Sequence, residues 1–173
     1  MRIRLLLGVV FMTMIAGCAV FGGAKSDKLY RSFYLDGNGL RYFIKPIEFK
    51  GENADLTIDF NIESNKGDTA VLNFSIFHEK PFKELDSFTI SNSNKTTVKP
   101  DEIESLFVEL KSQDIYQSRF TSKIPNTDIK EIFQNENWVI EVVKSNTSLK
   151  FESSRSNQKD IKLINKAVIQ LLD

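Results

Sequence analysis

Two neighbouring segments alternate apolar and polar residues with a period of two, and this pattern constrains the fold more than any other feature. The apolar positions are Leu56, Ile58, Phe60 and Ile62 in the first segment, and Ala70, Leu72, Phe74 and Ile76 in the second. Such alternation places one set of side chains on the core face of a strand and the other set outward. The polar segment 64–68 between them contains a glycine, so a β-hairpin is predicted.

Further strand patterns surround this hairpin. Residues 40–44 alternate in the same way, and Pro46 then shifts the phase, which indicates either an edge strand or a bulge. Shorter apolar alternations predict strands near residues 88–90, 96–98, 138–142 and 149–151. Residues 101–122 fit both a helix and a strand pair. The turn-like segment 111–114 favours a hairpin, and the helix remains the alternative.

The last third of the chain carries helical signals. Residues 125–127 precede Ile129 and Ile132, as in a short capped helix. Asn157 with Asp160 resembles an N-cap arrangement. After it, one helical face holds Ile161, Ile164, Val168 and Leu171, and the opposite face holds Lys162, Lys166 and Gln170. The fold class expected is α+β, an antiparallel β-sheet with a short helix and a C-terminal amphipathic helix packed on it.

The N-terminal segment 1–17 has the order of a secretory signal peptide. Arg2 and Arg4 form a basic start, and an apolar run over residues 5–15 is followed by small residues. The run is shorter than the roughly 20 apolar residues that a membrane-spanning helix needs. We therefore expect this segment to direct export and not to belong to the folded domain.

The segment Ile15-Ala16-Gly17-Cys18 resembles the lipobox of bacterial lipoproteins, whose usual form is Leu, a small residue, Gly or Ala, and then Cys. The resemblance implies cleavage between Gly17 and Cys18, a diacylglyceryl group on the Cys18 thiol, and usually acylation of the new α-amino group. It covers about one tenth of the chain and does not extend to the domain that follows. An ordinary secreted protein with an incidental cysteine is the alternative.

These features divide the chain into a lipoprotein signal peptide (1–17), a lipidated Cys with a flexible tether (18–28), and a single domain (29–173). The whole chain has 23 basic and 23 acidic residues, and loss of Arg2 and Arg4 leaves 21 against 23, a formal charge of −2. Near-neutrality gives no electrostatic case for binding nucleic acid, and it leaves the lipid as the membrane anchor. With Ala19 after the cysteine, the resemblance implies the periplasmic face of the outer membrane of a diderm bacterium.

Few residues are candidates for chemistry. The single Cys excludes an intramolecular disulfide, and the single histidine, His78, excludes a His-rich metal site. His78 is interpreted as a structural residue at a strand end. Residues 36–39 begin like a calcium loop, but the later ligand positions fail, so a tight turn is predicted. The acidic cluster Asp101, Glu102 and Glu104 is interpreted as a solvated surface. No catalytic residue, cofactor or metal is expected.

Aromatic residues concentrate just after the tether, and they are Tyr30, Phe33, Tyr34, Tyr42 and Phe43. Aromatic side chains are enriched in the cores of protein interfaces, so these five form a candidate interaction patch, with ordinary core packing as the alternative. The function expected is a lipid-anchored, non-catalytic binding or assembly module of the cell envelope, with the membrane and another envelope protein as partners. A small-ligand carrier in the envelope and an unrecognised hydrolase are the alternatives.

Overall fold

Two antiparallel β-sheets and two helices make up the part of the chain that the structure, a computed structural model, describes: residues 29–35, 39–64 and 68–172. The first sheet has six strands in the order β1-β2-β3-β4-β8-β7. In that order they are Tyr30–Leu35, Gly39–Lys50, Asp55–Glu63, Thr69–His78, Ile115–Pro125 and Glu104–Ser112. The second sheet has the order β10-β9-β5-β6, and its strands are Thr147–Glu152, Trp138–Lys144, Ser87–Asn92 and Thr97–Val98.

The alternating segments form the predicted hairpin. β3 and β4 pair antiparallel with Ile58 opposite Phe74, and every predicted core position on the two strands is buried. In β2 the register shifts between Ile44 and Ile47, around Pro46. Pro46 therefore lies at a bulge, and it also lies beyond Ile44, the last residue of β2 that pairs with β1, so both predicted settings apply to it. The strand β1 was not predicted.

The ambiguous segment 101–122 is also a hairpin, so the helical alternative is wrong. β7 and β8 pair antiparallel, with Ser112 opposite Ile115 across a tight turn. Asp114 in this turn has a φ of 69°, a left-handed conformation that Asp tolerates better than most residues.

The two sheets pack against each other through aromatic side chains. Phe74 of the first sheet stacks on Phe88 of the second with 4.0 Å between the ring centroids, and Phe120 lies 5.3 Å from Phe74. Trp138 contacts the rings of Phe49 and Phe60, and its indole N–H donates to the backbone oxygen of Asn135 over 2.8 Å. The prediction of one sheet was therefore incomplete, because the second sheet covers much of the core.

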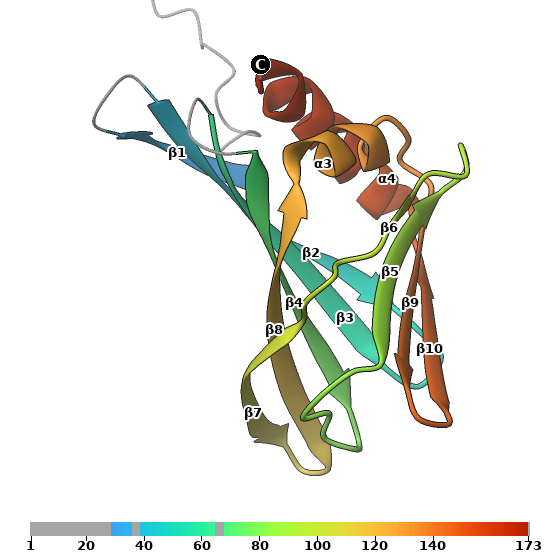
Figure 1. The fold of residues 1–173 in the computed structure, drawn as a ribbon. Coiled ribbons are helices and arrows are strands. Elements are labelled where there is room, and N and C mark those ends of the chain that lie inside the picture. Colours follow the sequence, from blue (N-terminus) through green and yellow to red (C-terminus); the bar gives the residue numbers. More distant parts are fainter. Residues whose placement is uncertain (1–28, 36–38, 65–67, 173) are drawn as a thin grey trace, which may run out of the picture.

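The helices lie together at one end of the two sheets (Figure 1). They are α3 (Asn126–Ile132), α4 (Arg155–Ala167) and the 3₁₀ turn η1 (Ile169–Leu171). α3 begins after Pro125 without a side-chain cap, so the predicted cap there is wrong. α4 is capped by Ser154, whose hydroxyl accepts from the backbone N–H of Asn157, so the predicted cap was three residues late.

The predicted buried stripe of the closing helix holds for Ile161, Ile164 and Val168. Leu171 is 58% exposed instead, and Leu172 is buried, because the α-helix ends at Ala167 and the 3₁₀ turn changes the angular spacing.

Taken together, these elements make the described part of the chain mainly antiparallel β-structure with two helices. Among these residues no helix is long and apolar enough to cross a membrane.

Candidate functional site

One face of the six-stranded sheet is left open by the described parts of the chain, because the second sheet and the helices lie on its other side (Figure 1). We call it the open face. The strand register sets rows of side chains across it. One row holds Arg31, Phe43, Asn61, Val71 and Lys123, and another holds Thr57, Ser75, Arg119 and Phe107.

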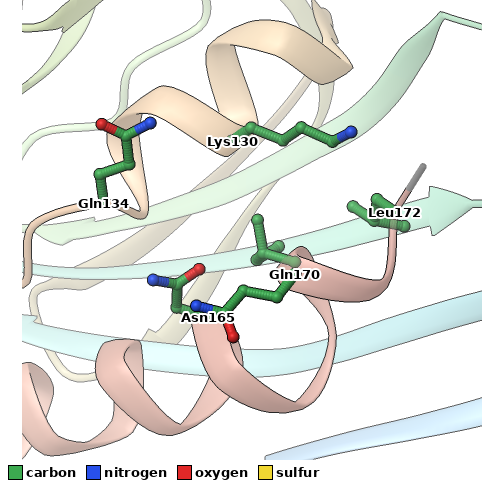
Figure 2. A pocket seen from close by; sticks show the side chains of 6 residues that line it. Lys130, Gln134, Asn165, Gln170 and Leu172 are labelled. Carbon is green, nitrogen blue, oxygen red and sulfur yellow. The ribbon is translucent and has the colours of Figure 1, made fainter.

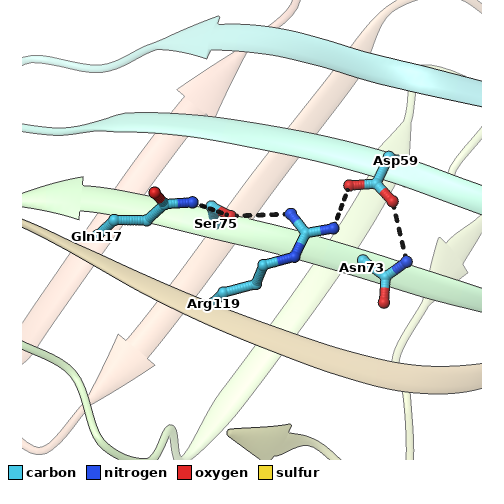
Figure 3. A network of polar contacts seen from close by, with 5 residues as sticks. All are labelled: Asp59, Asn73, Ser75, Gln117 and Arg119. Atoms are coloured by element: carbon cyan, nitrogen blue, oxygen red, sulfur yellow. Dashed lines mark hydrogen bonds and ion pairs between the residues drawn. The ribbon is translucent and has the colours of Figure 1, made fainter. Parts of the chain in front are cut away.

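A polar network occupies the middle of the open face (Figure 3). The Arg119 guanidinium donates to Asp59 Oδ2 over 2.8 Å and to Ser75 Oγ over 3.0 Å. Asn73 Nδ2 donates to Asp59 Oδ1 over 2.9 Å, and Gln117 Nε2 donates to Ser75 Oγ over 3.0 Å. These contacts join β3, β4 and β8 across the sheet.

The geometry of this network favours a structural role. Ser75 accepts hydrogen bonds from Arg119 and Gln117, and a nucleophilic serine needs instead a base that takes its proton. The carboxylate of the network belongs to Asp59, and both of its oxygens accept hydrogen bonds from other side chains. The Arg119–Asp59 ion pair is largely buried, with side chains 23% and 12% exposed, and breaking such a pair is costly. The network therefore holds three strands in register.

The edge strand β7 exposes three large apolar side chains. Leu106, Phe107 and Leu110 are 50%, 42% and 60% exposed. Among the described residues β7 pairs only with β8, so within this part of the chain the backbone groups along its other edge are left without a strand partner. The register against β8 shifts between Ser105 and Phe107 and between Leu110 and Ser112, which leaves Phe107–Leu110 as the regular stretch. This free edge can pair with an added strand.

The sequence contains a signal for the exposed apolar surface of β7. Leu106, Phe107 and Val108 are consecutive apolar residues, and consecutive positions of a strand point to opposite faces. A strand that is apolar on both faces is either central in a sheet or exposes apolar surface. The sequence leaves this choice open, and the sheet order places β7 at the edge.

The five aromatic residues of the candidate patch do not form one surface. Tyr42 is 5% exposed and packs in the core, where the Tyr30 ring lies 6.3 Å from it. Phe33 and Phe43 lie on the open face, 5.5 Å apart in an edge-to-face arrangement, and Tyr34 at the end of β1 is 91% exposed. Burial raises the pKa of the Tyr42 hydroxyl above its ordinary value, and repulsion from Tyr30 and Tyr34 adds to this.

His78 lies half-buried at the end of β4. Its Nδ1 accepts from the backbone N–H of Lys80 over 2.8 Å, and its ring lies 5.3 Å from that of Phe82. Both contacts come from the loop that follows the strand, as expected for a structural residue at a strand end.

The acidic residues Asp101, Glu102 and Glu104 line a surface depression of about 380 Å³ together with Lys123. In residues 29–35, 39–64 and 68–172 no cluster of His, Cys, Asp and Glu side chains could hold a metal ion. The calcium-like segment lies outside the described residues except for Gly39, which pairs with Leu35 as in a hairpin. Gly17 and Cys18 also lie outside them.

A second depression, of about 280 Å³, lies between the two helices (Figure 2). It is lined by Lys130, Gln134, Asn165, Ile169, Gln170 and Leu172. Amides and a single cation can bind a small polar molecule, and the described lining residues include neither a carboxylate nor an imidazole for acid–base chemistry.

No family model matches this chain, and no curated protein matches it.

Proposed function

We propose that this protein is a lipid-anchored component of the bacterial cell envelope and that its domain is a non-catalytic binding or assembly module. The lipobox-like segment ending at Cys18 supports the anchor. The observation that carries the binding role is the free edge of β7 with its exposed apolar side chains. We also infer an α+β classification, since the helices gather at one end of the antiparallel sheets.

The free edge supports one mode of binding in particular. An extended segment of a partner protein adds to an exposed sheet edge through main-chain hydrogen bonds, and its side chains meet those of the edge strand. On β7, Phe107 lies on the open face, opposite Arg119, while Val108 and Leu110 lie on the other face. A partner strand with apolar residues would therefore find apolar contacts on both faces of the sheet.

The interior of the domain supports a module in preference to a small-ligand carrier. A carrier needs an internal apolar cavity of several hundred Å³. The space between the sheets is instead occupied by stacked rings, with Phe74 against Phe88 and Phe49 against Trp138.

Replacing Cys18 tests the anchor. We expect Cys18→Ser to abolish incorporation of a palmitate analogue during growth, because the serine hydroxyl cannot replace the thiol as lipid acceptor. Ala19→Ser, which keeps the thiol, is the matched control and should be labelled normally. In-gel fluorescence of the labelled chain measures both. Undiminished labelling of Cys18→Ser would show that Cys18 is not the residue that carries the lipid.

Photo-crosslinking tests the edge. A photoreactive amino acid at Glu109, in the regular stretch of β7, is expected to give one discrete adduct in the native membrane. Leu106→Lys with Leu110→Lys should abolish that adduct, because added charge opposes strand addition at an edge. Leu163→Lys with Leu171→Lys changes two comparably exposed leucines, 45% and 58%, away from β7, and should leave the adduct intact.

The adduct also separates a partner protein from self-association. Its mass, minus that of one chain, is expected to differ from the mass of this protein. An adduct of two identical chains would show that β7 pairs with itself, and an adduct that survives both lysines would remove β7 from the binding site.

A further inference from the structure

We propose that the basic face of α4 binds the anionic lipid headgroups of the membrane that carries the anchor, and so fixes the orientation of the domain. This face is defined by five exposed residues of the helix, which are Arg155, Lys159, Lys162, Leu163 and Lys166. The inference rests on the proposed lipid anchor at Cys18. It adds which side of the domain meets the bilayer, which the anchor alone does not specify.

Helical spacing places the four cations together. They follow one another at intervals of four, three and four residues, which is the spacing of neighbours on a helix surface. The same geometry puts them opposite the buried side of α4, where Ile161 and Ile164 lie. Part of the basic face lines a surface depression of about 630 Å³, and the described lining residues are Lys159, Lys162, Leu163, Asn165, Lys166 and Gln170.

The four cations are not neutralised within the described part of the chain. No side chain of residues 29–35, 39–64 and 68–172 forms an ion pair with any of them. Asp160 is the only acidic residue of α4. Its neighbours three and four positions away are not basic, and they are Ser156, Asn157, Leu163 and Ile164. The basic face therefore keeps its positive charge.

The helix itself separates the basic face from the elements that pack on α4. The main strand packed against it is β2, and the contact is on the buried side, where Asn157 donates to the backbone oxygen of Glu48 over 2.6 Å. The turn η1 that follows α4 has no acidic residue. A helix with its side chains is about 10–12 Å across, and charges are screened over about 8 Å at physiological ionic strength. Carboxylates on β2 therefore contribute little to the potential at the basic face.

The distribution of charge favours an anionic occupant. The helix has four basic residues and one acidic residue, a formal charge of +3, and the mature chain 18–173 has −2 in all, which leaves −5 for the rest. An anionic surface therefore attracts α4 and repels the remainder of the domain, which orients it. Leu163, beside the cations, is 45% exposed and supplies an apolar side chain that can enter the headgroup region.

The tether enters the domain close to α4. Tyr30 begins β1 and pairs with Ile44 of β2, and the start of α4 contacts Glu48, four residues further along the same strand. Cys18 precedes Tyr30 by 12 residues, which span at most about 43 Å when fully extended. The helices lie at the end of the domain away from the β7–β8 turn (Figure 1). Docking through α4 therefore leaves the β7–β8 turn pointing away from the bilayer.

The strength of the contact is sufficient for a tethered domain. One basic side chain near an anionic surface favours binding by about fivefold, so four together supply roughly 600-fold. A short linker raises the effective concentration of the tethered face to about the millimolar range, where such a preference decides the orientation.

Spin labelling of the lipidated full-length mature protein tests the proposal, because Cys18 is the only native cysteine and its thiol carries the proposed lipid. The label is placed at Gln170→Cys, beside the basic face, or at Gln113→Cys in the β7–β8 turn as the distant control. Vesicles contain phosphatidylcholine with or without phosphatidylglycerol. In the anionic vesicles we expect the label at position 170 to become several-fold less accessible to an uncharged, water-soluble nickel complex, and the label at position 113 to stay accessible.

Two triple variants separate the effect of charge from mere proximity. Lys159→Gln, Lys162→Gln and Lys166→Gln together should restore nickel access at position 170, because three charges supply roughly 100-fold of the preference. Arginine at the same three positions keeps the charge and should retain the protection. The three lysines are exposed, so both variants should unfold at the temperature of the unchanged protein, measured by circular dichroism.

The outcomes distinguish the docking from the anchor. Equal accessibility at positions 170 and 113 on lipidated protein would overturn the docking and leave the anchor intact, and equal protection in neutral vesicles would overturn the role of charge. Protection in native membranes that is absent from anionic vesicles would assign the basic face to an acidic protein and overturn lipid as its occupant. A purified protein without the mass of the lipid would overturn the anchor, and the docking with it.

Discussion

Ile164→Asp is expected to unfold the domain, whereas Lys162→Asp on the same helix is expected to be tolerated. Ile164 is 0% exposed and lies in the middle of the buried stripe of α4, while Lys162 is exposed. Truncating a buried aliphatic side chain costs about 2–5 kcal/mol, and burying an unpaired carboxylate adds to that. The sum is a large share of the roughly 5–15 kcal/mol that holds a domain together.

Thermal unfolding of the two variants, followed by circular dichroism, measures this difference. The rival view is that α4 is a detachable arm that binds a partner. Its contacts argue against an arm, since Asn157 at the start of the helix donates to the backbone oxygen of Glu48 in β2 over 2.6 Å. If Ile164→Asp unfolded at the same temperature as the unchanged protein, α4 would not be a core element and would become a candidate interaction surface.

Phe74→Ala is the second substitution with a large expected effect, a loss of about 3–5 kcal/mol in the free energy of unfolding. Phe74 is 0% exposed and contacts Phe88 of the second sheet as well as Phe120 of its own sheet. Its removal leaves a cavity between the two sheets. The backbone on both sides is held by strand pairing, so the cavity can collapse only in part.

Phe77→Ala is the matched control, because Phe77 lies on the same strand but on the open face and is only half-buried. Its truncation should cost about 1 kcal/mol or less, in the range of ordinary partly exposed substitutions. Urea denaturation of both variants gives the two free energies of unfolding. Equal losses would mean that the space between the sheets is not the main core of the domain.

The sequence by itself determined which apolar residues of β3 and β4 face the core. The apolar residues at every second position from Leu56 to Ile62 and from Ala70 to Ile76 are all buried, because the side-chain period of a strand is independent of its partners. The core side of the closing helix followed from the same kind of local geometry. The lipobox-like segment is also a local signal, since it is read along the chain and needs no fold.

Tertiary structure alone decided which strands became neighbours. β5 pairs with β9, far along the chain, and β4 pairs with β8 and not with β5, so one predicted sheet became two. No local pattern encodes these pairings, because they depend on how all core faces are buried together. The polar network has the same origin, since Asp59 and Arg119 meet only through the register of β3, β4 and β8.

The candidate surfaces show the same division. The alternation of side chains along β1 and β2 places Phe33 and Phe43 on one face of the sheet and Tyr42 on the other. The strand β1, however, could be assigned only from its pairing with β2 in the structure. The apolar residues of β7 are evident in the sequence, yet their exposure comes from the absence of a further strand beside β7 among the described residues. A strand's composition is local, whereas its place at the centre or edge of a sheet is set by the other strands, and that place decides whether its side chains are buried or exposed.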